Sequence, residues 1–312
     1  MPNTDPPSST GTPQRGRFAP SPTGALHLGS AMAALGSWLF ARHAGGEWWL
    51  RIEDLDPPRE VAGAAAGQRR MLTAMGLVPD GRVVAQSTRG ALYARALEQL
   101  LDDGRAFRCH CSRAGLAAVG GVHRECSPGV RRRDPAVRLR VEDGLAVTFS
   151  DMVLGTVSQD VAGQVGDFVL RRADGLWAYQ LAVVVDDAAQ RITEVVRGAD
   201  LLGSTPRQIL LQRALGLTTP RHAHLPVVVD AGGDKLSKSL RSLPVDPTAP
   251  LPVLAAAWRL LGQDHAAIAG ARDVGTLLSA AQRAFAPRSV PGTPQRATPF
   301  AALHNGDPAT AE

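Results

Sequence analysis

Apolar runs of strand length alternate with longer amphipathic stretches along most of this chain. The apolar runs predict strands at residues 17–19, 48–52, 192–196 and 225–229. The amphipathic stretches predict helices at residues 26–42, 68–75, 91–101, 206–215 and within 251–284. Strands that alternate with helices are typical of a parallel sheet with helical crossovers, so we predict an α/β fold.

The alternation is interrupted in the middle of the chain. Residues 105–189 contain all three cysteines and several short alternating stretches, and we interpret them as an inserted α+β subdomain. The strands expected within it are residues 137–141, 145–149 and 168–170. The full expected organisation is a disordered tail (1–14), the first half of the α/β domain (15–104), the insertion (105–189), the second half (190–245), a short helical patch (246–285) and a flexible tail (286–312).

With 312 residues and 44% hydrophobic content, the chain has enough apolar material for one sizeable core and a second, smaller one. It has no apolar run of the length that a membrane helix needs, and residues 1–14 lack the apolar segment of a signal peptide. These features argue against a membrane or secreted protein and predict a cytoplasmic one. A net charge of +5 and a pI near 9.7 are compatible with a polyanionic partner such as nucleic acid.

The basic residues are unevenly divided, because only two of the 34 lysines and arginines are lysines, Lys235 and Lys238. Both lie within five residues after the flexible pair Gly232 and Gly233. An ammonium group is a compact and mobile charge, whereas a guanidinium is a rigid planar fork, so a lysine pair suits a loop that follows moving phosphate groups. The alternative is an ordinary charged loop in solvent.

A second candidate for phosphate binding lies near the N-terminus. Pro20 and Pro22 hold this segment extended, and Gly24 and Gly29 remove side chains where a ligand would approach the backbone. The expected helix begins here, and its N-terminus together with His27 favours an anion, for which a nucleoside triphosphate is the natural candidate. The alternative is a Pro-Gly turn with an incidental histidine. The segment is not a Walker A loop, since no Gly-Lys-Ser or Gly-Lys-Thr follows a four-residue spacer.

These two segments resemble signature motifs of class I aminoacyl-tRNA synthetases. Residues 27–30, His-Leu-Gly-Ser, are similar to the HIGH motif, and residues 235–239, Lys-Leu-Ser-Lys-Ser, are similar to the KMSKS motif. The segments that resemble the glutamate-specific branch are residues 17–24, 49–56 and 196–202. The resemblance covers residues 15–241 and implies a Rossmann-like catalytic domain that activates glutamate with ATP and Mg²⁺. Ser30 departs from the second histidine of the general motif.

The resemblance implies three catalytic residues, His27, Lys235 and Lys238. The positions that match glutamate-contacting residues are Arg17, Phe18, Ala19, Pro20, Ser21, Glu53, Tyr179 and Arg197. The positions implied for ATP are Gly24, His27, Gly29, Ser30 and Lys238. Arg197 is expected to bind a substrate carboxylate, and Glu53 the substrate ammonium group. Each residue also has an ordinary structural explanation, such as a surface arginine, a salt-bridging acid or a core aromatic residue.

Three cysteines in one short segment favour a metal site over disulfides in a reducing compartment. Cys109, Cys111 and Cys126 supply three thiolates, and a histidine completes a tetrahedral zinc set. His110 lies between two of the cysteines and points the other way on an extended chain, so we expect His123 to be the fourth ligand. A closed set of four ligands implies a structural zinc. The alternative is three reduced cysteines held by packing.

After residue 239 only a helical patch and a Pro-rich tail follow, too little for the helical anticodon-binding domain of ordinary glutamyl-tRNA synthetases. In this respect the chain resembles the glutamyl-Q tRNA(Asp) synthetases. That resemblance implies tRNA-independent, ATP-dependent activation of L-glutamate, followed by transfer of glutamate to the queuosine base in the anticodon of tRNA(Asp). The arginines at 131–133, with Arg138 and Arg140, are candidates for phosphate contacts to an RNA stem or simply a solvated basic turn.

Three other functions stay open at this point. A short glutamyl-tRNA synthetase that charges tRNA(Glu) would share every active-site residue. A nonenzymatic RNA-binding paralogue would keep the same core, although intact His27, Lys238, Arg197 and Glu53 argue against it. A different nucleotidyltransferase of the same superfamily would prefer an acid other than glutamate.

Overall fold

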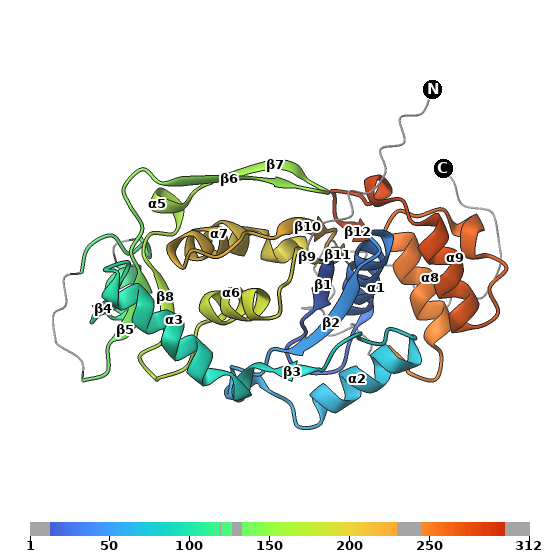
Figure 1. The fold of residues 1–312 in the computed structure, drawn as a ribbon, viewed down its shortest axis with the longest axis horizontal. Helices are drawn as coiled ribbons and strands as arrows, with labels where there is room; N and C mark the ends of the chain where they lie inside the picture. Colours follow the sequence, from blue (N-terminus) through green and yellow to red (C-terminus); the bar gives the residue numbers. More distant parts are fainter. Residues whose placement is uncertain (1–12, 119, 127–132, 230–244, 297–312) are drawn as a thin grey trace.

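The strands at the centre of the molecule form a parallel sheet whose members lie far apart in the sequence (Figure 1). The structure is a computed structural model that describes residues 13–118, 120–126, 133–229 and 245–296. One half of the sheet consists, in order, of β1 (Arg15–Phe18), β2 (Glu47–Ile52) and β3 (Val84–Ala85), all parallel. The other half consists, in order, of β9 (Glu194–Gly198), β10 (Arg221–Leu225), β6 (Ala146–Asp151) and β7 (Gly155–Asp160). In this second half only β7 runs antiparallel to its neighbour.

The two halves meet where β9 lies beside β1. The Thr193 N–H, just before β9, donates to the Arg15 carbonyl over 3.0 Å, and the Arg15 N–H donates to the Thr193 hydroxyl over 2.8 Å. From this junction the strand order runs outward in both directions, to β2 on one side and to β10 on the other. Such a reversal leaves a crevice at the carboxyl ends of the central strands, which is the usual ligand site of an open α/β sheet. The parallel sheet predicted from the sequence is confirmed.

Nine α-helices lie within the described residues, and several match the predicted bounds closely. Their bounds are α1 (Leu28–His43), α2 (Ala64–Ala74), α3 (Gly90–Asp102), α4 (Arg113–Ala117), α5 (Val161–Gln164), α6 (Tyr179–Ala189), α7 (Thr205–Ala214), α8 (Pro250–Leu260) and α9 (Val274–Ala284). Short 3₁₀ turns occupy Pro57–Arg59, Gln86–Thr88, Ala199–Ser204, His265–Ile268 and Pro287–Ser289. The helical patch expected at 251–284 is two helices, since Gly262 adopts a φ of 69° and ends the first.

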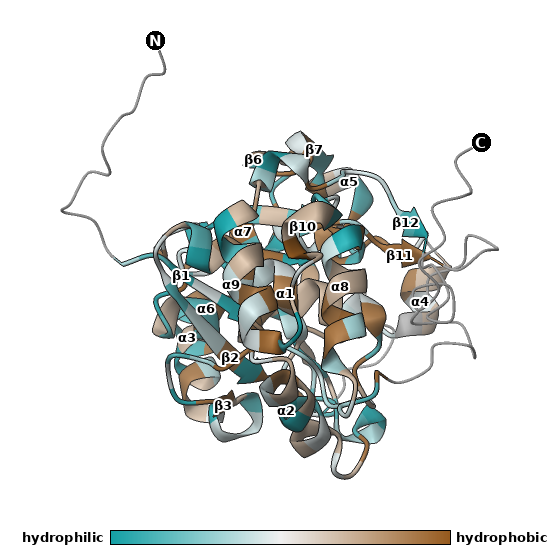
Figure 2. Ribbon diagram, turned by 90° about the vertical axis from the view of Figure 1, so that its right-hand side faces the viewer, coloured by the Kyte–Doolittle hydropathy of each residue, from teal (hydrophilic) through white to brown (hydrophobic). Residues whose placement is uncertain are grey.

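Helix α1 is the centre of the larger hydrophobic core. It is apolar around most of its circumference because it packs on β1 and β9 and also contacts α8 and α9 (Figure 2). Trp48 of β2 is fully buried in this core, and its indole N–H donates to the Ser37 hydroxyl over 2.9 Å. Each large apolar side chain buried in this way contributes about 1.5–3 kcal/mol. None of the helices in the described residues has both the length and the apolar character needed to cross a membrane.

The insertion predicted at 105–189 is only partly a separate subdomain. Its antiparallel sheet, at the end of the molecule opposite α8 and α9 (Figure 1), consists of β4 (Ala106–Cys109), β5 (Ala136–Leu139) and β8 (Phe168–Arg171). By contrast, β6 and β7 extend the parallel sheet, where Asp151 lies opposite His222 of β10. Helix α6, which was not predicted, packs against α7, and its run of valines at 183–185 is more typical of a strand.

The segment from residue 286 onward, expected to be a flexible tail, packs against the rest of the chain as far as residue 296, so that expectation is wrong over these residues. Val290 is buried, and β12 (Gln295–Arg296) pairs in parallel with β11 (Val228–Val229) at the edge seen in Figure 2. The strand predicted at 225–229 is split between β10 and β11, because Pro226 has no N–H for the sheet. Residues 1–12 and 297–312, the rest of the expected tails, lie outside the described residues.

Candidate active site

A cavity of about 780 Å³ lies at the junction of β1 and β9, at the carboxyl ends of the parallel strands. Its lining includes the twelve described residues that the sequence predicted to contact glutamate or ATP, namely Arg17, Phe18, Ala19, Pro20, Ser21, Gly24, His27, Gly29, Ser30, Glu53, Tyr179 and Arg197. Lys235 and Lys238, the remaining two, lie outside the described residues. The cavity is where a reversal of strand order places a ligand.

The loop after β1 is held in place by backbone hydrogen bonds and by one buried glutamine. The side-chain amide of Gln68, on α2, donates to the carbonyls of Ser21 and Gly24, each over 2.9 Å. The Glu53 N–H donates to the Pro20 carbonyl over 2.9 Å, which ties the end of β2 to the same loop. Gly24 has a φ of 151°, a conformation that residues with a side chain rarely adopt. Gln68 was not predicted, because a single glutamine on a helix gives no sequence signal.

The N-terminus of α1 borders the cavity through His27, Gly29 and Ser30. His27 is the N-cap residue, and its Nδ1 accepts a hydrogen bond from the Ser30 N–H over 3.2 Å. Because Nδ1 is an acceptor, the proton of the neutral ring is assigned to Nε2. A side chain at Gly29 would begin 3.1 Å from the His27 ring, so glycine leaves the space that the imidazole occupies. A helix N-terminus and an imidazole N–H both favour an anion such as phosphate.

Two arginines on neighbouring strands share one buried aspartate. Arg17 of β1 and Arg51 of β2 donate to Asp187 of α6 over 3.2 Å and 2.8 Å. Arg51 also pairs with Glu53 over 3.3 Å. Burial disfavours the ionised form of Asp187, but the two arginines outweigh burial and place the pKa of Asp187 below its usual value. Arg17 therefore lines the cavity as one member of an ion pair.

Arg197 differs from both, because its hydrogen-bond partners in the part of the chain that the structure describes are all uncharged. It donates to His224 Nε2 over 3.2 Å, to the Tyr179 hydroxyl over 3.3 Å and to the Thr205 hydroxyl over 2.7 Å. Burial lowers the pKa of His224, which keeps that ring neutral, and burial also lowers the pKa of Arg197. A buried guanidinium without a carboxylate partner is costly, and it is typical of a site that binds an anion.

Glu53 and Tyr179 line the same cavity as the arginines, and both residues are partly buried. Burial raises the pKa of both groups, and it is opposed mainly by the charge of Arg51 at Glu53 and by the charge of Arg197 at Tyr179. Glu53 is a carboxylate, and Arg197 is a guanidinium with no carboxylate partner among the described residues. A cavity with both groups suits a ligand that carries an ammonium and a carboxylate group.

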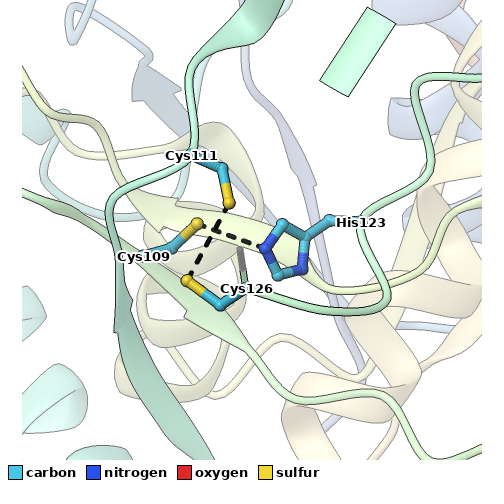
Figure 3. A group of neighbouring side chains, drawn as sticks. All are labelled: Cys109, Cys111, His123 and Cys126. Atoms are coloured by element: carbon cyan, nitrogen blue, oxygen red, sulfur yellow. Dashed lines mark hydrogen bonds between the residues drawn. The ribbon is translucent and has the colours of Figure 1, made fainter. Parts of the chain in front are cut away.

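Cys109, Cys111, His123 and Cys126 come together beside β4, with their ligand atoms within 4.8 Å of one another (Figure 3). Cys109 Sγ lies 3.3 Å from His123 Nε2, and Cys111 Sγ lies 3.9 Å from Cys126 Sγ. This is the set predicted from the sequence, with His123 as its histidine. Three thiols and an imidazole can hold a metal ion, and zinc prefers such ligands.

Asp167, which was not predicted, orients His123 within this group. Its Oδ2 lies 2.8 Å from His123 Nδ1, so the ring proton is assigned to Nδ1 and the lone pair of Nε2 points toward Cys109. Burial, with hydrogen bonds to Cys109 and Cys126, raises the pKa of Cys111 to about 11. A bound cation has the opposite effect, because metal-bound thiols lose their protons.

Most of the residues that the sequence analysis missed are partners of the predicted ones. Asp186 and Asp187 follow the apolar residues of α6 directly, and both are buried. Two acids in such a position indicate buried cations, so this pair could have been found.

In the basic run, Arg138 donates to the Asp167 carbonyl over 2.8 Å, and the Arg140 guanidinium lies 4.8 Å from the centre of the Phe107 ring. Residues 131 and 132 lie outside the described residues.

The family described as tRNA synthetases class I (E and Q), catalytic domain, matches residues 14–133 and 121–246. Among solved structures, a glutamate tRNA ligase from Elizabethkingia meningosepticum CCUG26117, in complex with its amino acid, is similar with a TM-score of 0.74 and 25% identity. The similarity covers 92% of this chain and 67% of that one.

Curated relatives are more similar in sequence. The glutamyl-Q tRNA(Asp) synthetase of Xanthomonas campestris pv. campestris (strain 8004) is 59% identical over 281 residues, which cover 89% of this chain and 94% of that protein. The glutamyl-Q tRNA(Asp) synthetase of Burkholderia mallei (strain ATCC 23344) is 53% identical over 264 residues, which cover 80% of this chain and 89% of that protein. The chain therefore belongs to the class I tRNA synthetases for glutamate and glutamine, and within them to the family of the glutamyl-Q tRNA(Asp) synthetases.

Proposed function

We propose that the chain catalyses the ATP-dependent activation of L-glutamate without tRNA, and then transfers the glutamyl group to the queuosine base in the anticodon of tRNA(Asp). The observation that carries this proposal is Arg197, a buried guanidinium whose described partners are uncharged. It lines one cavity with Glu53 and with the N-terminus of α1. The cavity thus offers opposite charges to an amino acid and a helix N-terminus to a phosphate. Relatives that are 53–59% identical carry the name of this activity.

In the proposed complex Arg197 binds a carboxylate of glutamate, and Glu53 accepts a hydrogen bond from its ammonium group. The other proposed contacts come from the end of β1, its following loop and the start of α6, and they are Arg17, Phe18, Ala19, Pro20, Ser21 and Tyr179. A ligand with an amide in place of the bound carboxylate would leave the Arg197 guanidinium uncompensated. The site is therefore expected to discriminate strongly against such a ligand.

The proposed ATP-binding residues are Gly24, His27, Gly29, Ser30 and Lys238. A carboxylate oxygen of glutamate attacks the α-phosphorus of ATP, a new P–O bond forms, and the bond to pyrophosphate breaks. His27 Nε2–H, Lys235 and Lys238 stabilise the negative charge on the phosphate oxygens. Mg²⁺, when bound together with ATP, would supply further positive charge. The roles of Lys235 and Lys238 are supported by the family match, which extends to residue 246.

The decisive experiment follows radiolabelled glutamate onto tRNA. Label is expected on tRNA(Asp) that contains queuosine, and not on unmodified tRNA(Asp) or on tRNA(Glu). Glutamate-dependent exchange of pyrophosphate into ATP is expected without any tRNA. Label on tRNA(Glu) alone would identify a short glutamyl-tRNA synthetase, and absent exchange would favour a nonenzymatic RNA-binding protein. An enzyme that acts on tRNA(Asp) is expected in the cytoplasm.

Replacing Lys238 with arginine is expected to slow pyrophosphate exchange by about tenfold to a hundredfold and to leave the fold intact. A planar guanidinium cannot follow the departing pyrophosphate as a point charge does, although the net charge is unchanged. The measurement is kcat for exchange, with thermal unfolding as the test of the fold. Arg213→Lys, an exchange of the same two side chains at an exposed position of α7, is the control. If the Lys238→Arg variant exchanges pyrophosphate at the wild-type rate, Lys238 is an ordinary surface residue.

We also propose that the Cys109, Cys111, His123 and Cys126 group holds one structural zinc ion. Bound zinc would cross-link the segments on either side of the metal group. Metal analysis of the natively purified protein is expected to give about one zinc per chain. His123→Ala is expected to lose the metal, whereas His110→Ala, the matched histidine change outside the group, should retain it. Equal zinc in both variants would remove His123 from the ligand set, and zinc near zero in the wild type would remove the site.

A further inference from the structure

Behind Arg197 lies a buried chain of polar groups that does not line the cavity. Its members are Asp151 at the end of β6 and His224 on β10, and both side chains are fully buried. Asp151 Oδ2 lies 2.6 Å from His224 Nδ1, and His224 Nε2 lies 3.2 Å from Arg197 Nε. A carboxylate, an imidazole and a guanidinium therefore follow one another across three neighbouring strands, β6, β10 and β9.

The first link of this chain decides which nitrogen of His224 carries the proton. Asp151 Oδ1 accepts the backbone N–H groups of His224, Val153 and Leu154, over 3.2, 3.0 and 3.0 Å, so the carboxylate cannot rotate without losing them. Its Oδ2 is left to accept a hydrogen bond from the imidazole. His224 therefore carries its proton on Nδ1, and its Nε2 is an acceptor.

The second link requires this tautomer. The Nε–H of Arg197 is always a donor. The Thr205 hydroxyl oxygen accepts from Arg197 over 2.7 Å. The O–H of Thr205 is therefore free to donate to His224 Nε2, which lies 3.0 Å away. Both neighbours of Nε2 are thus donors. A proton on Nε2 would face the guanidinium N–H directly and push Arg197 out of its place.

The consequence reaches the cavity through the remaining N–H groups of Arg197. A guanidinium has five N–H groups, and described residues take three of them, one each for His224, Thr205 and Tyr179. One N–H on each terminal nitrogen is left for a ligand. The two oxygens of a carboxylate can accept from both nitrogens, provided that the plane of the guanidinium is fixed.

We propose that Asp151 and His224 are positioning residues for substrate binding: Asp151 fixes the tautomer of His224, and His224 holds Arg197 in the plane that receives the carboxylate of glutamate. The proposal rests on the proposed function, since it assigns the ligand of Arg197 to glutamate. The ionised neighbours of these three residues are Arg17, Asp187 and Glu53. The other imidazole is His222, which stacks on His224 with ring centres 6.2 Å apart. Among the described residues, the groups that accept hydrogen bonds from Arg197 are His224, Tyr179 and Thr205, and none of the ionised neighbours is one of them.

Asp151→Asn tests the first link with almost no change of shape. The asparagine oxygen can keep the three backbone N–H groups, and its NH₂ group then donates to His224 Nδ1 and moves the ring proton to Nε2. The KM for glutamate in pyrophosphate exchange is expected to rise about tenfold or more, with the KM for ATP within about twofold of the wild type. A ¹⁵N spectrum of histidine-labelled protein is expected to show the change of tautomer at His224 without any substrate.

His224→Gln separates positioning from a general loss of structure. The amide oxygen of glutamine can take the place of Nε2 as an acceptor, and it does not depend on Asp151 for its protonation. Glutamate KM is expected to stay near the wild-type value in His224→Gln, and Asp151→Asn should then have no further effect in the double variant. Asp160→Asn is the matched control. Asp160 caps α5 at the surface, and its described contacts do not include Asp151, His224 or Arg197.

Two results would overturn the proposal. One is an equal rise in the KM values for glutamate and ATP in Asp151→Asn. The other is an effect of Asp151→Asn that persists in the His224→Gln background. If the wild type itself shows no glutamate-dependent exchange, the proposed function fails instead, and the ¹⁵N spectrum still decides whether Asp151 sets the tautomer.

Discussion

Replacing Arg197 with glutamine is expected to lower kcat/KM for glutamate about a thousandfold in pyrophosphate exchange, while the folded state stays at least as stable as the wild type. The loss follows from the cavity, where the described partners of the guanidinium are uncharged and leave one N–H on each terminal nitrogen for a carboxylate. The apparent affinity for ATP should change little, because the proposed phosphate contacts come from the first turn of α1 and from the lysine loop.

The expected stability of the Arg197→Gln variant is the less usual part of this prediction. Removing one partner of a buried ion pair normally destabilises a protein, because the other charge is left alone. Here the described partners are Tyr179, Thr205 and His224, and burial already disfavours the charged form of Arg197. The glutamine side chain relieves that cost and can still accept or donate a hydrogen bond. A residue kept for binding at the expense of stability is typical of an active site.

Urea unfolding at neutral pH and exchange kinetics at saturating ATP test the two halves of the prediction. Arg213→Gln, the same change at an exposed position of α7, is the control and should leave both measurements unchanged. A variant that keeps its glutamate KM would show that the carboxylate binds elsewhere. A variant that loses activity only because it unfolds would show that Arg197 is a structural residue.

The αβ alternation could be predicted from the local pattern of apolar residues, whereas the residues that line the cavity were predicted from their resemblance to the motifs of class I synthetases. Part of that lining is also local in the sequence. The strand that ends at Phe18, the Pro-Gly loop and the helix that starts at Leu28 are consecutive, so chain order alone brings Arg17, His27 and Gly29 near one another. The candidate metal group is equally local, with its four residues inside an 18-residue segment from Cys109 to Cys126. Short separations of this kind leave few alternative arrangements.

Contacts between distant segments could not be predicted in the same way. Asp187 meets Arg17 across 170 positions and Arg51 across 136 positions, and Asp151 meets His224 across 73. Nothing in one sequence says which buried acid neutralises which arginine, so Arg17 and Arg197 looked equivalent although only Arg17 has a carboxylate among its described contacts. The pairing of β12 with β11 was missed for the same reason, because two-residue strands carry no recognisable period.

Asp187→Asn is expected to destabilise the protein by about 3–5 kcal/mol, the opposite of the result expected at Arg197. The change keeps the volume of the side chain. It removes the one carboxylate that Arg17 contacts among the described residues. It also removes the carboxylate that lies closest to Arg51. Both arginines are almost completely buried, so water cannot replace the lost charge. The measurement is the free energy of unfolding from urea titration at pH 7, and Asp174→Asn, at an exposed ion pair, is the matched control.

The pH dependence and a second substitution identify the cause of that loss. The pKa of Asp187 lies below its usual value, so its stabilising effect is complete above the unfolded-state pKa, about 4, and declines as the pH falls toward the folded-state value. The difference between the wild type and Asp187→Asn should therefore shrink below about pH 4. Adding Arg17→Gln to Asp187→Asn should recover part of the lost stability, because it removes the charge left without a partner. If the two losses simply add, the unpaired charge of Arg17 is not what destabilises the single variant.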